Sequence, residues 1–304
     1  LVKTSPKEWE PCIQAARKGK LDTLILLQDH GYPWDKLACN EAAGQNHLLC
    51  LQYLHENGCP WDHEVFVYAG RRGHIDCVRY AHEEGLGWHE YVSWEIAKWG
   101  HLEVLKYALD NGCPCDERAV KFAVIDGHVD CVRCLLVHGS PVNTGACMNA
   151  ASGGQIECLR LLCEFNTPLD ANVTANAANF NQLTCLQYLH EVGCPWDERV
   201  TDSAAFRGNL PILQYAMRHG CPVDGDSIVL RAVAGARHFH RIGGGERGAA
   251  FQPIDLVLLE QELDAAGQPL HRILALAVHR AKVELGLHLD AHRRHRTARR
   301  RLII

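Results

Sequence analysis

The sequence has no long apolar run. Its longest uninterrupted candidate, Ile273–Val278, is far shorter than the roughly 18 residues that a membrane-spanning helix needs. The first residues, Leu1–Lys7, lack the apolar stretch of a secretory signal peptide. These absences argue against a membrane protein and against signal-directed secretion. Because the chain does not begin with Met, we expect upstream sequence to be missing.

Signatures of catalysis are absent as well. The chain has no His-Glu-x-x-His motif, Walker loop, dinucleotide-binding glycine fingerprint or nucleophile elbow. The run Gly243–Gly245 is predicted to be a flexible joint rather than a phosphate cradle. A Cys/His nucleophilic pair stays open from sequence alone, although most candidates fall on repeated positions. We therefore expect a protein that is not an enzyme, with no catalytic residue and no cofactor.

The chain carries no large excess of either charge. Its formal net charge is −5 over 304 residues, which argues against a surface coated in nucleic acid. Apolar residues make up 47% of the chain, enough to form the core of two ordinary domains or of one elongated array.

Gly or Asn recurs in two series with a period of 27 residues. These two residue types enter the left-handed αL conformation most readily, and an αL residue closes a helix. Each repeat is therefore predicted to read helix, αL stop, helix, αL stop. The predicted αL residues are Gly19, Asn46, Gly73, Gly100, Gly127, Gly154, Asn181 and Gly208 in the first series, and Gly31, Gly58, Gly85, Gly112, Gly139, Asn166, Gly193 and Gly220 in the second.

Other positions agree with this pattern. Small pairs such as Ala42-Ala43 centre the first helix of a repeat, an Asp such as Asp35 opens it, and Pro33 stiffens the connection before it. A short helix pair cannot bury its apolar face alone, but stacked pairs can. The sequence predicts an all-α fold, an α-solenoid of stacked helix-turn-helix repeats over residues 1–235, with about eight full repeats and a partial ninth.

The stretch Gly127–Asn143 resembles the second half of an ankyrin repeat, and Gly73–Asp76, Gly100–Glu103 and Ala204–Gly208 match parts of the same pattern. Ankyrin repeats usually have about 33 residues, whereas these have 27. The usual Thr-Pro-Leu-His opening is also absent. The resemblance therefore implies ankyrin-like repeats that lack or shorten the β-hairpin finger.

The motif Gly-Cys-Pro-Trp-Asp occurs at Gly58–Asp62 and Gly193–Asp197. It is similar to divergent ankyrin arrays of amoebae and their giant DNA viruses. Such arrays often follow an F-box, the adaptor segment of ubiquitin ligases. No F-box is visible, so a ubiquitin-ligase partner would depend on residues ahead of Leu1. The expected location is intracellular and cytoplasmic (the host cytoplasm if the protein is viral), with the nucleus as an alternative.

Fifteen Cys raise the question of disulfides or zinc. Five of them share one helix position that Val104 and Ile212 occupy in other repeats, so they are expected to be small buried apolar residues in a reduced intracellular protein. A zinc site at Cys113-Pro-Cys115, or at Cys59 with His63, is the alternative, but neither has a convincing second half, so no metal is predicted. The five are Cys50, Cys77, Cys131, Cys158 and Cys185.

Histidine and tryptophan also recur. The four His residues that follow an αL position are expected to be buried and to bond backbone groups across repeats. Four Trp residues share a loop position and are expected to pack as a ladder, with a ligand-stacking strip as the alternative. These residues are His47, His74, His101 and His128, and Trp34, Trp61, Trp88 and Trp196.

In ankyrin-like stacks, the two residues before the first αL position face the concave side. Here these residues change type between repeats, as a recognition surface would. Trp and Arg among them are usual hot-spot types. Ordinary solvated residues, with Trp94 packed between repeats, are the alternative. The candidate partner-binding residues are Arg71, Arg72, Trp94, Lys98, Trp99, Asp126, Phe180, Phe206 and Arg207.

The composition changes near residue 235. We expect a Gly/Arg-rich joint over residues 236–252, two helices that could cap the array over 253–292, and a basic, disordered tail over 293–304. Residues Arg293–Arg301 could instead be a nuclear address or a nucleic-acid contact.

Together these patterns predict a monomeric, non-enzymatic protein-protein interaction scaffold that presents a concave surface to an unidentified protein partner. The alternatives are the substrate-recognition arm of an F-box adaptor and a nucleic-acid-associated factor that acts through the Arg-rich tail.

Overall fold

A computed structural model describes residues 6–223, and within that range every regular element is a helix. The predicted all-α class and the lack of a β-hairpin finger are confirmed for these residues. The predicted segments 236–252, 253–292 and 293–304 lie outside the described residues. The helices are α1 (Pro6–Arg17), α2 (Leu21–Asp29), α3 (Lys36–Gly44), α4 (Leu48–Glu56), α5 (Glu64–Gly70), α6 (Ile75–Glu83), α7 (Val92–Lys98), α8 (Leu102–Asp110), α9 (Glu117–Ile125), α10 (Val129–Val137), α11 (Thr144–Gly153), α12 (Ile156–Glu164), α13 (Ala171–Asn179), α14 (Leu183–Glu191), α15 (Glu198–Arg207) and α16 (Leu210–Arg218).

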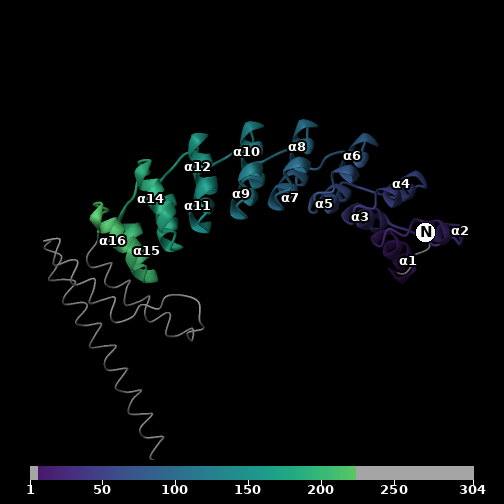
Figure 1. The fold of residues 1–304 in the computed structure, drawn as a ribbon, viewed down its shortest axis with the longest axis horizontal. Helices are drawn as coiled ribbons and strands as arrows, with labels where there is room; N and C mark the ends of the chain where they lie inside the picture. Colours follow the sequence, from purple (N-terminus) through teal and green to yellow (C-terminus); the bar gives the residue numbers. More distant parts are fainter. Residues whose placement is uncertain (1–5, 224–304) are drawn as a thin grey trace, which may run out of the picture. The chain divides into compact units, whose positions relative to one another are not determined.

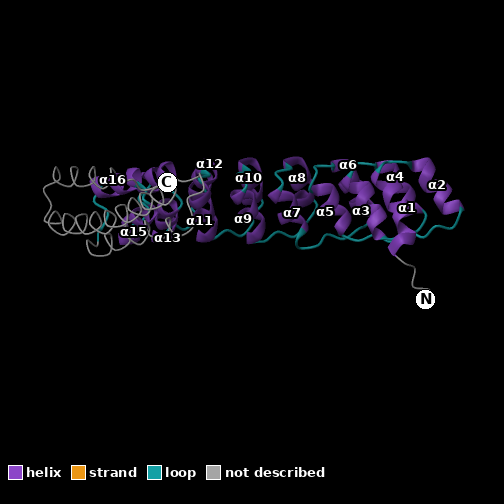
Figure 2. Ribbon diagram, turned by 90° about the horizontal axis from the view of Figure 1, so that it is seen from below, coloured by secondary structure: helices purple, strands orange, loops and turns teal. Residues whose placement is uncertain are grey.

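The chain divides into two compact units. Among the described residues, the N-terminal unit comprises 6–150 and 155–168, and the C-terminal unit comprises 151–154 and 169–223. In the N-terminal unit, α1, α3, α5, α7 and α9 pack side by side in one layer, and α2, α4, α6, α8, α10 and α12 form the other (Figures 1 and 2). In the C-terminal unit, α13 packs on α15 and α14 packs on α16. Both units are therefore α-solenoids of stacked helix pairs.

The helix pairs follow the period of the sequence. From α2 to α16, each even-numbered helix begins 27 residues after the previous one. All sixteen predicted αL residues have positive φ, from 56° at Asn166 to 82° at Gly85. The backbone therefore turns at the same two points in each of the eight helix pairs of residues 6–223.

The two series of αL residues differ in their surroundings. A Cβ on Gly100 would lie 2.5 Å from Nδ1 of His128, and one on Gly73 would lie 2.7 Å from Nδ1 of His101. A Cβ on Gly112, in the second series, would have no atom within 4 Å. At Gly73 and Gly100, glycine therefore serves both the positive φ and the space that the His ring of the next repeat occupies.

Aspartate side chains cap the starts of the odd-numbered helices. Asp35, Asp116, Asp170 and Asp197 each accept a hydrogen bond from the backbone N–H two residues later. Asp62 accepts the equivalent bond from Glu64 N at 3.0 Å. These bonds satisfy N–H groups that a helix start leaves unpaired. The sequence also predicts a cap at the equivalent position in the next repeat, Asp224, which lies outside the described residues.

Side chains that follow the first αL series link neighbouring repeats. Nε2 of His101 bonds the carbonyl oxygen of Arg71, and Nε2 of His128 bonds that of Lys98, both at 3.0 Å. The expected bonds across repeats therefore form at these two residues. The expectation that the imidazoles are buried was wrong, because each His lies in the turn between the two helices of its pair and stays partly exposed.

The expected tryptophan ladder was also wrong. Trp61 stacks on His55 with 3.9 Å between ring centroids, and Trp196 stacks on His190 at 4.3 Å. Nδ1 of His55 is hydrogen bonded to the hydroxyl of Tyr80 in the next repeat at 2.9 Å. A His ring thus stacks on each of these Trp rings and links it to the next even-numbered helix. The Trp61 ring also lies 6.0 Å from that of Tyr80, and Nε1 of Trp88 donates to the carbonyl oxygen of Asn111 at 3.0 Å, so Trp side chains brace neighbouring repeats through such contacts.

Within residues 6–223, no helix combines the length and apolarity needed to cross a bilayer.

Candidate functional site

The predicted binding residues of the N-terminal unit lie on or just after the odd-numbered helices α5, α7 and α9, which Figure 1 shows in one layer. All of them except Trp94, in the first turn of α7, stand at the C-terminal ends of these helices. The αL residues Gly73, Gly100 and Gly127 end these helices and so fix where the last side chains project. We define the odd-layer surface as Arg71, Arg72, Trp94, Lys98, Trp99, Lys121, Phe122, Ile125 and Asp126.

Arg71 braces two helices. Its Nε and Nη2 donate to the two carboxylate oxygens of Glu95 on α7, at 2.8 and 3.0 Å. The Glu95 side chain is only 10% exposed. The hydrogen bond that Glu95 accepts raises the pKa of the Arg71 guanidinium. Arg17 and Glu41 form the same pair between α1 and α3 at 2.9 Å. The charge of Arg71 is therefore already neutralised within the protein.

Arg72 is more open. Its Nη1 donates to the amide oxygen of Gln45 at 2.8 Å, and it has no carboxylate within ion-pair distance among residues 6–223. Its side chain lies on the surface. The Arg72 charge is therefore available to a partner.

Trp94 packs between helices. Its ring lies 5.0 Å from the ring of Phe122 on α9, and the guanidinium carbon of Arg118 lies 6.0 Å from its centroid. Its buried Nε1 has no hydrogen-bond partner among the described residues. Trp94 therefore supports the other residues of the odd-layer surface by packing between repeats, which was the alternative interpretation of this residue.

Trp99 is the most exposed aromatic side chain of this surface. Half of it (50%) is exposed, as is 40% of Ile125. The ammonium of Lys98 lies 5.9 Å from the ring of Trp99 and 5.8 Å from that of Phe122, and the ammonium of Lys121 lies 5.9 Å from Phe122. Such distances permit cation–π attraction. Apolar and cationic groups therefore share one area of the surface.

Sequence reasoning missed Phe122, Lys121 and Glu95. Phe122 and Glu95 share one repeat position, four residues before the C-cap residues Asp126 and Trp99. Residues four apart lie on the same helix face. That spacing was the signal in the sequence that could have found Phe122 and Glu95.

The C-terminal unit carries the remaining predicted residues. Phe180 stands at the repeat position of Trp99 and is likewise 50% exposed. Nε of Arg207 donates to Oδ1 of Asn179 at 3.0 Å, and Phe206 is partly exposed. The C-terminal unit thus presents the exposed ring of Phe180. It also presents Arg207 of the next repeat, whose guanidinium is hydrogen bonded to the side-chain amide of Asn179.

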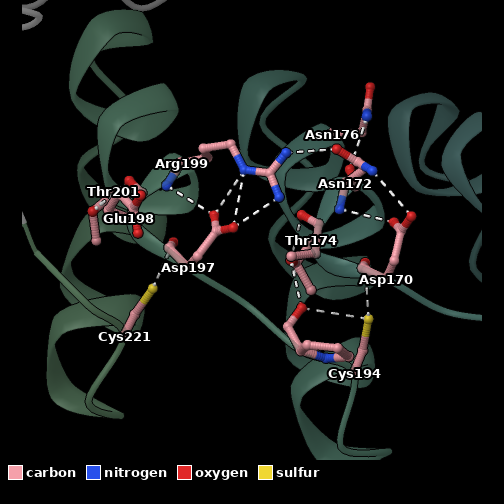
Figure 3. Close-up of polar contacts among 12 residues, drawn as sticks. Asp170, Asn172, Thr174, Asn176, Cys194, Asp197, Glu198, Arg199, Thr201 and Cys221 are labelled. Atoms are coloured by element: carbon pink, nitrogen blue, oxygen red, sulfur yellow. Dashed lines mark hydrogen bonds and ion pairs between the residues drawn. The ribbon is translucent and has the colours of Figure 1, made fainter.

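The polar groups at the start of α13 and α15 bond one another (Figure 3). Arg199 pairs with Asp197 at 2.7 Å and donates from Nη1 to Oδ1 of Asn172 at 2.6 Å. The bond from Arg199 lowers the pKa of the Asp197 carboxyl. Cys194 donates to the carbonyl oxygen of Asp170 at 3.5 Å. The contacts serve to hold neighbouring repeats together.

All fifteen cysteines lie in the described range as free thiols, and twelve are buried. Burial raises the pKa of the Cys113 and Cys131 thiols to about 12, so neither supplies a thiolate nucleophile near neutral pH. Among residues 6–223, no group of three or more His, Cys, Asp or Glu side chains is placed to hold a metal ion. The pairs Cys113/Cys115 and Cys59/His63 therefore have no further ligands there.

A family model described as "Ankyrin repeats (3 copies)" matches residues 93–176, a range that includes Trp94, Lys98, Trp99 and Asp126. No curated protein matches the chain. Ankyrin repeats are in general protein-protein interaction modules. Residues 93–176 thus match ankyrin repeats, and they lie within an α-solenoid of helix-turn-helix repeats.

Proposed function

We propose that the protein is a non-enzymatic interaction scaffold whose protein partner binds the odd-layer surface of the N-terminal unit. The observation that carries this proposal is the half-exposed Trp99, a large apolar side chain held at the end of α7, together with the open charge of Arg72 just after α5. Trp and Arg are enriched at the centres of protein interfaces.

The surface is formed before any partner arrives. The Arg71–Glu95 pair ties α5 to α7, and the Trp94–Phe122 contact ties α7 to α9. A preformed surface loses little conformational freedom on binding, so more of the contact energy becomes affinity. The scaffold therefore acts by rigid display and needs no chemical step.

Two alternatives draw no support from the described residues. A ubiquitin-ligase adaptor role would rest on an F-box, and a nucleic-acid role would rest on Arg293–Arg301, which lies outside residues 6–223. The fifteen free thiols support an intracellular, reducing location as part of this proposal.

The test is a pull-down from cell extract with the intact chain and with the Trp99→Ala/Arg72→Ala variant. The matched control is Lys106→Ala, an exposed substitution on the even-numbered helix α8. We expect the double variant to lose the partner while its melting temperature stays unchanged. Full retention of every partner by the double variant would contradict the proposal.

A further inference from the structure

Only one of the four cationic side chains of the odd-layer surface has a carboxylate partner among the described residues. Arg71 is neutralised by Glu95. Arg72, Lys98 and Lys121 have no carboxylate within ion-pair distance among the described residues. The surface as defined contains a single acid, Asp126. It therefore carries an excess of positive charge.

This excess runs against the composition of the chain. The formal net charge of the protein is −5, so a positive area is not what its average composition would produce. Fixed cations on an otherwise acidic protein attract a short anionic segment locally, whereas the acidic remainder repels a long polyanion. Charge complementarity thus favours an acidic peptide segment over a nucleic acid.

The same area also exposes apolar side chains that a partner can cover. Trp99 and Ile125 expose 50% and 40% of their surface. Covering them with an apolar side chain removes that surface from water. Covering them also withdraws the neighbouring ammonium of Lys98, which is 5.9 Å from the Trp99 ring, from part of its solvent. A cation that loses water needs a carboxylate partner to offset the cost.

Resting on the scaffold function proposed above, we infer that the odd-layer surface binds an acidic segment of its protein partner. One large apolar side chain of that segment packs on Trp99 and Ile125. Carboxylates on either side of it pair with Lys98 and Lys121 on one flank and with Arg72 on the other. The charged contacts set orientation and speed association, and the apolar contact supplies much of the affinity.

The test selects a phage-displayed library of random twelve-residue peptides on the full chain. We expect the selected peptides to carry Asp or Glu on both sides of one Phe, Trp, Leu or Ile. Their affinity, measured by fluorescence anisotropy, should fall about tenfold or more in the Lys98→Glu/Lys121→Glu variant and should weaken as salt rises. Lys106→Glu, which reverses the charge of one lysine on the even-numbered helix α8, should leave the affinity unchanged.

A milder variant guards against misfolding. Lys98→Gln/Lys121→Gln removes both charges without reversing them, and it should also weaken binding while keeping the thermal melt of the intact chain. If the Gln and Glu variants bound acidic peptides as tightly as the intact chain does, the inference would be overturned, as it would by a selection that yields no acidic peptides.

Other outcomes separate the two proposals. Selected peptides that are basic or uncharged, yet are lost on Trp99→Ala, would overturn the acidic segment while leaving the scaffold proposal intact. A twenty-residue polyuridylate that binds through Lys98 and Lys121, when no acidic peptide does, would assign the surface to nucleic acid. Retention of the natural partner by the Trp99→Ala/Arg72→Ala variant would instead contradict the scaffold proposal itself.

Discussion

Ile96 of α7 fills the space that a side chain on Gly70 of α5 would need. A Cβ on Gly70 would lie 2.6 Å from Cγ1 of Ile96, which is fully buried. Ala43 and Ala97 stand at the position of Gly70 in the neighbouring repeats, and Ala69 and Ala123 stand at that of Ile96. A small residue on one helix thus compensates for a large one on the next.

The close packing of Ile96 against Gly70 predicts that Gly70→Ala destabilises the protein by about 1–3 kcal/mol through overpacking. Ala is the better helix former by about 1 kcal/mol, so propensity alone predicts the opposite sign. Urea denaturation measures the difference. In the Ile96→Ala background, Gly70→Ala should cost much less, because the clash has gone. A stabilising Gly70→Ala in the intact chain would refute this packing relationship.

Gly100 and Gly112 offer a matched comparison, since their φ angles are 76° and 78°. Gly112→Ala should cost about 1–2 kcal/mol, the strain of a Cβ in the αL region. Gly100→Ala should cost more, because its Cβ would also lie 2.5 Å from Nδ1 of His128. Thermal or urea unfolding of the two variants tests the order. Equal losses would show that His128 moves away freely.

Asp197 predicts a specific pH dependence. Its carboxyl pKa is lowered in the folded protein by the bond from Arg199, so the folded state binds fewer protons than the unfolded state over that range. The stabilisation is present above the unfolded pKa of about 3.9 and is lost as the pH falls through the lower folded value. Asp197→Asn keeps a capping side chain but removes the charge. The variant should therefore lose less stability than the intact chain between about pH 5 and pH 2.

The control for that experiment is Asp170→Asn. Asp170 caps α13 at the same repeat position, but its side-chain bond comes from the amide of Asn172 rather than from a guanidinium. We measure the unfolding free energy by urea denaturation at several acidic pH values. The dependence of that free energy on pH should change less for Asp170→Asn than for Asp197→Asn. The reverse order would contradict the role given to Arg199.

The thiols should be slow to react in the folded protein. Burial raises the pKa of the Cys77 and Cys131 thiols to about 12, so almost no thiolate is present at pH 8. In a titration with Ellman's reagent, we expect the partly exposed Cys115, Cys134 and Cys163 to react first. All fifteen should react in denaturant. Rapid native reaction of the buried set would contradict the observed packing.

Core and surface positions should separate stability from binding. Leu105 is fully buried between the helix layers, and Leu105→Ala should lose about 2–5 kcal/mol of unfolding free energy. Trp99→Ala should change it by less than about 0.5 kcal/mol. Paired urea curves test both. If Trp99→Ala destabilises as much as Leu105→Ala, then Trp99 is a packing residue rather than a recognition residue.

The backbone of this fold was largely predictable from the sequence, because it depends on local properties. Positive φ at Asn46 and Gly112 follows from the few residue types that tolerate αL. A cap such as Asp35 bonds a backbone N–H only two residues away. The helix period and the all-α class depend on these local rules alone.

The details of the surface were not predictable, because they depend on contacts between repeats. Pairing of Arg71 with Glu95, which removes Arg71 from the free charges, requires the distance between α5 and α7. Stacking of Trp61 on His55 likewise depends on how a loop returns to its helix. A single sequence lists the side chains of each repeat but not the spacing that decides which of them meet.

Site-specific photo-cross-linking tests the central claim most directly. A photoreactive phenylalanine would replace Trp99 on the odd-layer surface or, as controls, Leu49 and Val137, which are each 67% exposed on even-numbered helices. The account predicts that the bound partner cross-links to the probe at position 99 and not to those at 49 and 137. Adducts from the even-numbered helices, with none from position 99, would contradict it.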